Sequence, residues 1–489
     1  MSNEKNLEKI VSWAKRRGFI FPDSEIYGGL SGIYDFGPYG LALKNNIKKL
    51  WWKTFVEDRD DVVGIESAIL MNRKVWQASG HEGNFVDEMV ECRKCHQRFR
   101  IDEISQEENS KTQNPNIKQS SNIKCPNGGE HEFTEPKKFN PMFKTHVGVI
   151  EDEKSMTYLR PETAQGMFVN FKQVMETSRK KVPFGIAQMG KSFRNEINTK
   201  DFLFRVREFE IAEIEYFVKP PSTSSGQAGD DEKFFDEWLK NWEDFVLGLG
   251  IKKENIKQYE HPKEGLSHYS KRTVDIQYNY PFGWKELTGC ANRTDFDLKS
   301  HQKSSGKGLS CFDEQSKEKY IPYVIEPTMG IERLMLAIIC DAFEEVPDGR
   351  QDSHPEQSEG SPANAGLADK LPDSSSPSQN DTLEIVLHFL PKLAPVKIAV
   401  LPLVKKLSKD ARAVYDDLKS CWGDIEFDES GSIGRRYRRQ DEIGTPFCVT
   451  FDFDSLEDKK VTVRDRDSMK QDRIEIKELK NYLFGKLSF

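Results

Sequence analysis

The stretch that decides the fold is VPFGIAQMGKSFRNEINTKDFLFRVREFEIAEIEYF, residues 182–217. Two runs with strand-like composition, 183–196 and 204–217, are joined by the polar connection 197–203. This arrangement predicts a long antiparallel hairpin. Side chains alternate along a strand, so one face of the second run is expected to present Arg205, Arg207, Phe209, Ile211, Glu213 and Glu215. Cations, an aromatic ring and acids in this order suit a ligand with a phosphate, a flat base and an ammonium group.

Two other interpretations of this stretch are open. The alternating charges also fit an exposed strand with a solvated charge ladder. Residues 185–192, GIAQMGKS, match the phosphate-loop pattern G-x-x-x-x-G-K-S/T. That loop must lead into a helix whose N-terminus holds the phosphate, whereas the residues after Ser192 have the composition of a strand and a turn. A phosphate-loop NTPase would also need a second acidic strand motif, which we do not find in the sequence.

Length and composition limit the class of protein. A chain of 489 residues can hold two to four domains. Because the net charge is −8, RNA would have to bind a local basic patch rather than a global basic field. The longest apolar run, 334–340, is too short to cross a bilayer, so no membrane association is expected. Eight cysteines with a single Cys-x-x-Cys indicate reduced thiols and predict a cytoplasmic protein.

Five segments resemble a known family. FRNE (193–196), a loop and RVREF (205–209) resemble motif 2 of the class II aminoacyl-tRNA synthetases. EPTMGIER (326–333), followed by LMLAII, resembles motif 3, a strand that runs into a helix with its arginine at the junction. The other three are similar to the dimeric glycyl-tRNA synthetase family: GIYDFGPYGLALKNNIKKLWW (32–52), YLRPETAQGMF (158–168) and GWKELTGCANRTDFDL (283–298). The resemblance covers most of the chain outside two insertions.

The resemblance implies an α+β fold, with an antiparallel catalytic sheet flanked by helices and a C-terminal α/β anticodon-binding domain. Residues 1–87 and 142–345 are expected to form the catalytic domain, interrupted by a zinc-knuckle-like insertion at 88–141. Residues 346–388, rich in Ser, Pro, Asp and Gly, predict a disordered linker or insertion. Strand and helix patterns alternate in 389–489, the expected anticodon-binding domain. A homodimer is also implied.

The implied reaction is attack of the glycine carboxylate on the α-phosphorus of ATP, with release of pyrophosphate, followed by transfer of glycine to the 3′ end of tRNA(Gly). No covalent enzyme intermediate is needed, so positioning and charge stabilisation at phosphorus should supply the catalysis. Arg205 is expected at the γ-phosphate, and Glu286 near the Mg²⁺ that accompanies ATP. The catalytic residues implied are Arg194, Glu196 and Arg333.

The segments that resemble motifs 2 and 3 also define the expected ATP site. Arg194 is expected at the α-phosphate and the acyl carboxylate, with Glu196 near the adenine amino group. Phe209 would stack on adenine, with Arg333 over its other face or at the terminal phosphate. The expected ATP-binding residues are Arg194, Asn195, Glu196, Phe204, Arg205, Val206, Arg207, Glu208, Phe209, Glu286, Leu287, Gly330 and Arg333. For each arginine taken singly, a structural ion pair is the alternative.

Selection of glycine poses a physical problem, because glycine has no side chain to grasp. The site must hold the ammonium group and exclude any Cβ, and carboxylates crowded around a small cavity can do both. Arg100 belongs to a segment, RFRID, that resembles a family segment whose second arginine reaches the active site; a surface position is the alternative. The expected glycine-binding residues are Arg100, Glu162, Phe209, Glu213, Glu326, Thr328 and Gly330.

The insertion contains CRKC (92–95) and CPNGGEH (125–131), separated by the polar run 105–121, which is expected to be a loop. Because Zn²⁺ takes four N or S ligands tetrahedrally, a zinc ribbon needs two ligand pairs. Relatives often have C-P-x-C at the second knuckle, but position 128 is glycine here. The candidate ligands are Cys92, Cys95 and Cys125, with His131 or His96 as the fourth. A former site held by packing alone is the alternative.

GRRYRR (434–439) is the one concentrated basic cluster of the C-terminal region. Arginine beside tyrosine suits phosphate contact and base stacking, although a charge run can also be a solvated face. From the domain resemblance, the expected tRNA-binding residues are Arg435, Arg436, Tyr437, Arg438 and Arg439.

Two functions other than glycine–tRNA ligation are alternatives for this sequence. A non-catalytic nucleic-acid-binding relative, such as the polymerase accessory subunit that resembles this family, should have lost the motif arginines and acids. The sequence retains Arg194, Glu196, Phe209, Glu286 and Arg333. A synthetase for another small amino acid is harder to exclude on physical grounds, but PETAQG and KELTG favour glycine.

Overall fold

The computed structural model describes residues 7–101, 125–199, 201–221, 230–267, 269–314, 317–347 and 383–487. The chain forms two compact units. The first contains Met1–Val11, Ile20–Asp35 and Ile47–Ala337; the second contains Ser12–Phe19, Phe36–Asn46 and Ile338–Phe489. The expected polar loop at 105–121 and most of the expected linker lie outside the described residues.

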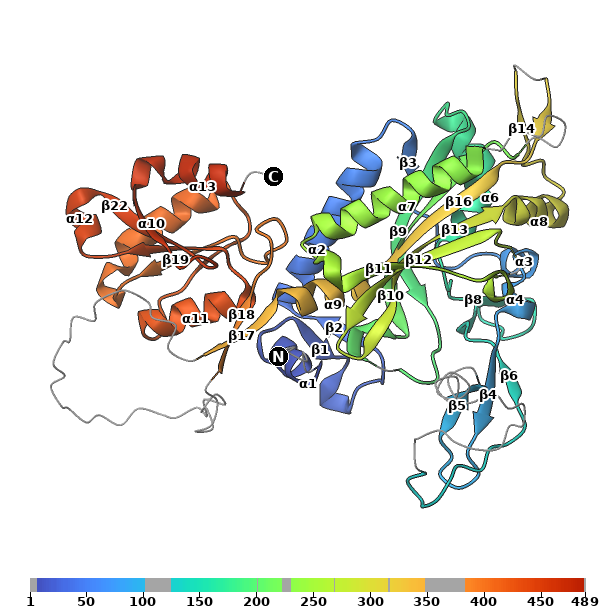
Figure 1. Ribbon diagram of the computed structural model, residues 1–489, viewed down its shortest axis with the longest axis horizontal. Helices are drawn as coiled ribbons and strands as arrows, with labels where there is room; N and C mark the ends of the chain where they lie inside the picture. The colour runs from blue at the N-terminus through green and yellow to red at the C-terminus, as the bar shows by residue number, and fades with distance from the viewer. Residues whose placement is uncertain are drawn as a thin grey trace. The chain divides into compact units, whose positions relative to one another are not determined.

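The first unit is built on a seven-stranded sheet (Figure 1). Its strand order is β11-β12-β13-β16-β10-β9-β3, and only the β3–β9 pair is parallel. The strands are β3 (Val62–Gly64), β9 (Phe184–Phe193), β10 (Glu208–Val218), β11 (Ile256–Glu260), β12 (Arg272–Tyr280), β13 (Gly283–Thr294) and β16 (Tyr323–Gly330). The predicted hairpin is confirmed, because β9 and β10 pair antiparallel from Phe193↔Glu208 to Phe184↔Phe217.

The two faces of this sheet carry different layers. Helix α7 (Asp230–Gly248) packs on one face, where the ring of Tyr216 on β10 lies 5.2 Å from that of Trp238. Helices α6 (Ala164–Thr177) and α8 (Phe296–Ser305) lie on the other face, where the rings of Phe171 and Phe217 are 4.3 Å apart. Alternation along β10 therefore directs Phe209, Ile211, Glu213 and Glu215 to the face opposite α7.

Residues 185–192, which match the phosphate-loop pattern, lie within strand β9, and residues 194–196 after it form no helix. Gly190 is explained by packing instead, because a Cβ there would lie 2.2 Å from the Arg160 guanidinium. That guanidinium donates hydrogen bonds of 2.7 Å to the backbone oxygens of Lys191 and Ser67. The phosphate-loop interpretation is therefore excluded.

The junction that resembles motif 3 has the expected form: β16 ends at Gly330 and α9 (Ile331–Ala342) begins at the next residue, with Arg333 in its first turn. The remaining elements that contribute to the first unit, some shared with the second, are α1 (Leu7–Arg16), β1 (Ile20–Pro22), β2 (Tyr34–Phe36), α2 (Pro38–Trp52), α3 (Arg73–Ala78), α4 (His81–Asn84), β7 (Lys144–His146), β8 (Met156–Tyr158), β14 (Cys311–Phe312) and β15 (Lys319–Tyr320).

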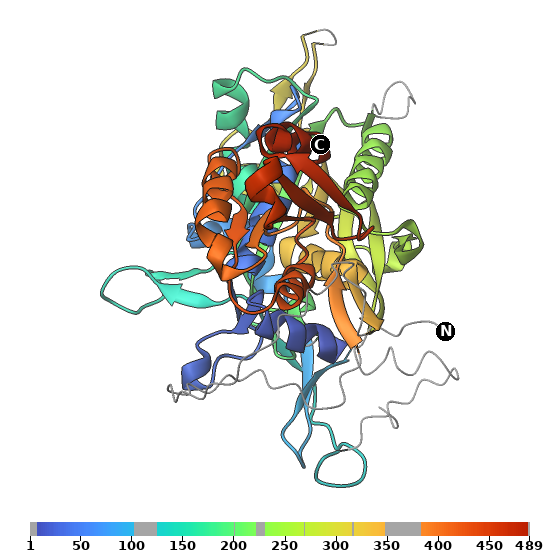
Figure 2. The ribbon, with the colours of Figure 1, turned by 90° about the vertical axis from the view of Figure 1, so that its left-hand side faces the viewer.

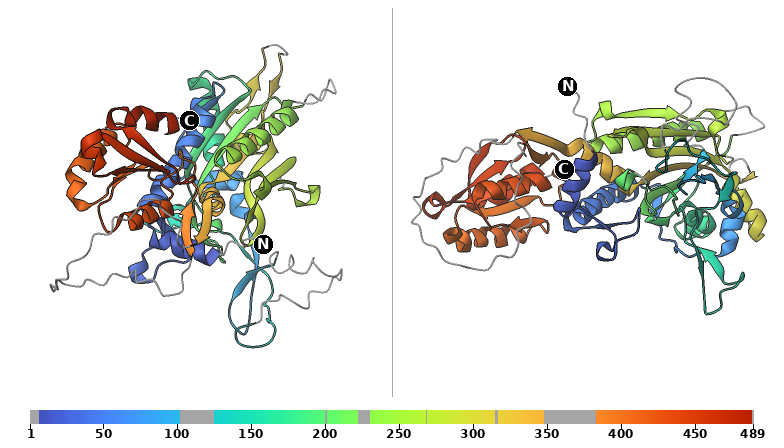
Figure 3. Two further views of the ribbon diagram at one scale, coloured as in Figure 1. Left: turned by 60° about the vertical axis from the view of Figure 1, so that its left-hand side comes forward. Right: turned by 90° about the horizontal axis from the view of Figure 1, so that it is seen from below.

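The insertion is a small separate sheet of the first unit, with order β5-β4-β6. Its strands are β4 (Asp87–Glu91), β5 (Arg98–Arg100) and β6 (Lys137–Phe139). In the left view of Figure 3 it projects at the bottom of the picture, in blue and teal.

The second unit has a five-stranded sheet with order β20-β19-β21-β22-β23, in which β20, β19 and β21 are parallel. Helices α10 and α13 pack on one face and α11 on the other (Figure 1 and Figure 2). Its elements are β19 (Ile398–Pro402), α10 (Ser408–Lys419), β20 (Ile425–Phe427), α11 (Ile433–Ile443), β21 (Phe447–Phe451), α12 (Asp454–Asp458), β22 (Lys460–Asp465), β23 (Gln471–Glu475) and α13 (Leu479–Leu487). The expected α+β fold with a C-terminal α/β domain is confirmed.

The ends of the expected linker, 346–388, are ordered strand. Strands β17 (Phe343–Pro347) and β18 (Leu383–Leu387) pair antiparallel, from Phe343↔Leu387 to Pro347↔Leu383. Val386 and Leu387 are buried, so LEIVL is a strand that packs into the second unit. The predicted linker therefore wrongly included strand residues at both of its ends. The segment has no aromatic residue, and a short aliphatic strand such as LEIVL was not recognised without one.

Among the helices that the structure describes, none is both long enough and apolar enough to cross a membrane.

Candidate active site

A cavity of about 210 Å³ opens on the β10 face that is turned away from α7. The expected site residues that line it are Glu162, Arg194, Glu196, Phe204, Arg205, Val206, Phe209, Glu213, Glu286, Glu326, Thr328, Gly330 and Arg333. The expected residues outside its lining are Arg100, Asn195, Arg207, Glu208 and Leu287. The lining residues that were not expected are Leu203, Tyr269, Thr288, Arg293, Met329 and Glu332; Ile211, expected on this face, also lines it.

One group of lining residues combines cations with aromatic rings. The Arg194 guanidinium lies 5.4 Å from the centroid of the Phe209 ring, and that of Arg333 lies 4.4 Å from the centroid of Phe204. Both arginines are fixed by backbone oxygens: Arg194 Nε donates to Pro161 at 3.1 Å, and Arg333 Nε donates to Phe204 at 3.1 Å. Cationic guanidinium groups beside aromatic faces can hold a phosphate chain and a flat base together.

Two carboxylates accompany these arginines. Glu286 pairs with Arg333 at 3.0 Å, and Glu196 lies 3.7 Å from Arg205. The Arg333 guanidinium holds the pKa of Glu286 below its usual range, although the Glu286 side chain is still 46% exposed. Glu286 is therefore ionised at neutral pH and available to a cation that enters the cavity with a ligand.

The strand that carries the site residues Phe209 and Glu213 begins later in the chain than the sequence predicts. Strand β10 begins at Glu208, so Arg205 and Arg207 precede it and strict alternation does not apply to them. Arg205 still lines the cavity, whereas Arg207 donates to the backbone oxygens of Glu196, at 2.9 Å, and of Ser31. Glu208 pairs with Lys191 at 2.7 Å. Neither side chain lines the cavity, so this arrangement gives no support to the ATP contacts expected of Arg207 and Glu208.

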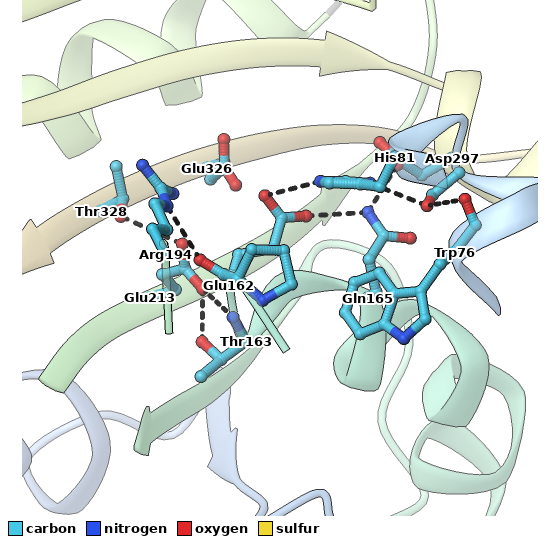
Figure 4. A network of polar contacts seen from close by, with 12 residues as sticks. Trp76, His81, Glu162, Thr163, Gln165, Arg194, Glu213, Asp297, Glu326 and Thr328 are labelled. Carbon is cyan, nitrogen blue, oxygen red and sulfur yellow. Dashed lines mark hydrogen bonds and ion pairs between the residues drawn. The ribbon is translucent and has the colours of Figure 1, made fainter. Parts of the chain in front are cut away.

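A second group of lining residues is a cluster of buried carboxylates (Figure 4). Glu213 is only 3% exposed. Its Oε2 accepts hydrogen bonds from the backbone N–H of Thr163, at 2.8 Å, and from the Thr163 hydroxyl, and its Oε1 accepts from the Thr328 hydroxyl at 3.2 Å. Burial and the nearby Glu162 raise the pKa of Glu213 despite the Thr163 hydrogen bonds.

Glu162 and Glu326 complete the cluster with opposite pKa shifts. Glu162 accepts from Gln165 Nε2 at 3.0 Å and lies 3.3 Å from His81 Nε2. Burial alone would raise the pKa of Glu162, but the neighbouring His81 and Arg293 outweigh burial and hold this pKa below its usual range. Arg293 lies 2.7 Å from Glu326 and lowers the pKa of this carboxyl group. Burial and the neighbouring carboxylates have the larger effect and raise the pKa of Glu326 to about 8.

Arg293 is the buried cation of this cluster. It donates to Asp297 at 2.8 and 3.1 Å and lies 4.1 Å from the centroid of the Tyr269 ring. Behind the lining, Glu215 is fully buried and neither of its oxygens has a hydrogen-bond partner among the described residues; burial and Glu326 raise its pKa well above the usual range. The cluster thus contains more carboxyl groups than cations, so it retains protons unless a small cation replaces them.

Sequence reasoning missed His81 and Arg293. Arg293 lies in the quoted segment 283–298, and its i,i+4 spacing to Asp297 was a usable signal. His81 stands alone on the short helix α4, and only the tertiary fold brings it to Glu162. Arg100, which was expected near glycine, instead pairs with Asp87 of β4 at 3.3 Å and does not line the cavity.

The basic cluster of the second unit is not one exposed patch. Arg436 and Tyr437 are buried in α11: Arg436 donates to the backbone oxygens of Pro402 and Leu403, and the Tyr437 hydroxyl lies 2.5 Å from that of Thr450. Because both side chains are buried, they are not available to RNA, and the prediction of RNA contact is corrected for these two residues. Arg438 pairs with Glu384, Arg439 pairs with Asp428, and Arg435 is exposed.

The expected metal ligands of the insertion do come together. One ligand atom from each of Cys92, Cys95, Cys125 and His131 lies within 4.8 Å of all the others. His96, the other candidate for the fourth position, is not part of this group: its side chain is 76% exposed, and its Nδ1 lies 3.2 Å from Glu91.

Comparisons with known proteins agree with this arrangement. Residues 143–342 match the family model described as "tRNA synthetase class II core domain (G, H, P, S and T)", and residues 397–485 match "Anticodon binding domain". The seven-stranded, mainly antiparallel core, the arginine-lined cavity and the C-terminal α/β unit therefore define a class II aminoacyl-tRNA synthetase.

Full-length relatives narrow the class to a family. The glycine–tRNA ligase of Caldanaerobacter subterraneus subsp. tengcongensis is 50% identical over 495 residues, which cover 99% of each chain. That of Acetivibrio thermocellus is 50% identical over 504 residues, all of each chain. The chain belongs to the glycine–tRNA ligase family. A solved structure of the RNA-binding domain of threonyl-tRNA synthetase from Cryptosporidium parvum Iowa II shares the fold alone, with a TM-score of 0.62 and 15% identity over 99% of this chain and 98% of that one.

Proposed function

We propose that this chain is an enzyme, a glycine–tRNA ligase that forms glycyl-adenylate from glycine and ATP and then charges tRNA(Gly). One observation supports this most directly. A single cavity contains a group of arginines and phenylalanines that suits a nucleotide, and beside it a buried carboxylate cluster that suits a small ammonium ion. A non-catalytic nucleic-acid-binding protein would have no use for so costly an arrangement of buried acids.

In the first step, a glycine carboxylate oxygen attacks the α-phosphorus of ATP, and the bond to the bridging oxygen of pyrophosphate breaks. Arg194 would bind the α-phosphate and the attacking carboxylate, so it opposes the charge that develops between them. Phe209 would stack on adenine, while Arg205 and Arg333 would bind the phosphate chain. Mg²⁺ would neutralise phosphate charge, and Glu286 and Glu196 offer the oxygen ligands that this ion takes.

In the second step, a hydroxyl of the terminal ribose of tRNA attacks the glycyl carbonyl, and AMP leaves. The second unit would bind the anticodon region, with the exposed Arg435 as the first residue of its basic cluster to contact phosphate. A homodimer and a cytoplasmic location stay predictions. The location is supported by the eight cysteines, which all lie in the described part of the chain and form no disulfide there.

ATP–pyrophosphate exchange with glycine, alanine, serine and proline tests the proposal. We expect exchange with glycine to exceed that with each of the others by at least about 100-fold in kcat/KM, because the carboxylate cluster leaves no room for a Cβ. The same protein should charge a tRNA(Gly) transcript. Exchange with none of the four would support the non-catalytic alternative, and equal or better exchange with alanine, serine or proline would identify a synthetase for another amino acid.

Glycine binding should also release a proton. Glu326, with a pKa of about 8, is protonated at pH 7 in the free site. An ammonium ion beside it favours the carboxylate and lowers this pKa, so binding should release about one proton at pH 7 and progressively less as the pH rises through 8 to 9. Titration calorimetry in buffers of different ionisation enthalpy measures this number. Glu326→Gln should abolish the release, and a proton count that is equal at pH 7 and pH 9 would contradict the assignment.

A further inference from the structure

We infer that the insertion holds a structural Zn²⁺ ion, bound by the Sγ atoms of Cys92, Cys95 and Cys125 and by Nδ1 of His131. The distances already match this coordination: Cys92 Sγ and Cys125 Sγ are 4.0 Å apart, and Cys95 Sγ lies 3.6 Å from His131 Nδ1. In tetrahedral zinc sites with Zn–S about 2.3 Å and Zn–N about 2.0 Å, neighbouring ligand atoms are separated by about 3.5–3.8 Å.

The backbone around each cysteine is shaped to present its sulfur. After Cys92, the N–H of His96 bonds to the Cys92 oxygen at 2.8 Å, and His96 adopts a left-handed φ of 57°. After Cys125, the N–H of Gly128 bonds to the Cys125 oxygen at 2.9 Å, with a φ of 90° at Gly128. Each cysteine therefore opens a tight turn, closed over five residues after Cys92 and over four residues after Cys125. Position 128 is glycine because the second turn needs a backbone conformation that L-residues rarely adopt.

His131 replaces the missing cysteine from three residues further along the chain. Its ring is oriented by two aromatic neighbours: it stacks on Phe133 at 5.6 Å and meets Phe99 edge-on at 4.9 Å. The bridge between Cys92 and Phe133 and the hydrogen bond from Arg93 N–H to the Glu132 oxygen, 2.7 Å long, connect the two halves of the site. The ring is thus held with Nδ1 toward the three sulfurs.

The chemistry of the ligands favours zinc and a structural role. Three thiolates with one imidazole in a tetrahedral set are typical of Zn²⁺, whereas carboxylate-rich sets suit Mg²⁺ or Ca²⁺. Four protein ligands fill the tetrahedron, so no position is left for water or substrate. A disulfide between Cys92 and Cys125 is the competing arrangement, but their sulfurs are about twice as far apart as bonded ones.

The centre is connected to the active site through one strand. Cys92 directly follows β4, which begins at Asp87. Just before β4, the ring of Phe85 lies 5.6 Å from the Arg194 guanidinium, and His81 lies 3.3 Å from Glu162. A centre that fixes the far end of β4 would therefore also restrain two side chains that contact residues of the proposed glycine and α-phosphate site.

The test is the metal content of the full-length protein, purified without chelators and analysed by plasma mass spectrometry. We expect one zinc per chain, and Co²⁺ exchanged into the site should show the absorption of a tetrahedral thiolate complex. Cys125→Ser should lose the metal, whereas His131→Cys should keep one zinc. His131→Ala should release zinc to a chelator at least about tenfold faster, because one direct ligand is gone. His96→Ala is the matched control and should release it at the unaltered rate.

Three results would overturn the inference. The first is protein that holds less than a tenth of an equivalent of zinc even after reconstitution under reducing conditions. The second is a mass two hydrogens short under non-reducing conditions, which would identify a disulfide. The third is faster zinc release from His96→Ala with no change for His131→Ala, which would assign the fourth ligand to His96. None of these readouts depends on aminoacylation activity.

Discussion

Glu213→Ala should lower kcat/KM for glycine in ATP–pyrophosphate exchange by about 100- to 1,000-fold, because it leaves the ammonium group of glycine without its buried carboxylate partner. The KM for ATP should change little, since Glu213 lies in the carboxylate cluster and not among the arginines. The fold should survive. The substitution removes hydrogen bonds from Thr163 and Thr328, but it also relieves the repulsion that raises the pKa of the neighbouring Glu326.

A matched control for this variant lies on the same strand. Glu208 pairs with Lys191 at 2.7 Å and does not line the cavity, so Glu208→Ala should leave the exchange rate within about twofold. Thermal unfolding of both variants separates lost binding from lost structure. If Glu213→Ala retained the glycine KM and kcat while its melting temperature fell, Glu213 would be a structural carboxyl and the glycine site would have to be placed elsewhere.

The sequence predicted the features that depend on local pattern. The β9–β10 hairpin follows from two runs of strand-like composition around a polar connection, and alternation along the second run predicted that Phe209, Ile211 and Glu213 would share a face. The prediction was wrong where the chain left the regular strand: Arg207 lies before β10 and donates to backbone oxygens. Charge patterns identify residues for a site, but only backbone geometry decides which of them reach it.

The basic cluster of the second unit shows a different kind of error. The charges of GRRYRR predict a surface patch, yet this segment lies in helix α11, where Arg436, Tyr437, Gln440 and Ile443 are buried. Gln440 is four residues after Arg436, three after Tyr437 and three before Ile443. Residues at this spacing lie on one side of a helix, so a helix with one buried side was a possible interpretation of the sequence. Arginine could be buried there because backbone oxygens of Pro402 and Leu403 accept its hydrogen bonds.

Contacts between distant segments could not be predicted at all. His81 meets Glu162 from a separate helix, and Arg293 on β13 meets Glu326 on the neighbouring strand β16. Both residues lower the pKa of Glu162, so the electrostatics of the site were beyond sequence reasoning even where its acids were correctly expected.

Arg194→Ala should reduce the kcat of glycine-dependent exchange by about 100- to 1,000-fold, the range observed when one donor is removed from a charge-stabilising site. The guanidinium is expected to bridge the α-phosphate and the attacking carboxylate, so its effect should be largest in the transition state, and the KM for ATP should rise much less than kcat falls. Arg194→Lys should recover part of the loss, because an ammonium restores the charge without the bidentate geometry.

Lys191→Ala is the control for charge: Lys191 lies on β9 just before Arg194 and pairs with Glu208 outside the cavity, so its loss should leave kcat within about twofold. The division between kcat and KM decides the role of Arg194. A variant with unchanged kcat and a large rise in the KM for ATP would mean that Arg194 only holds ATP in the ground state. The stabilisation of the pentacovalent phosphorus would then have to come from Arg205, Arg333 and the bound Mg²⁺, because the other lining arginine, Arg293, is paired with Asp297 and Glu326 in the carboxylate cluster.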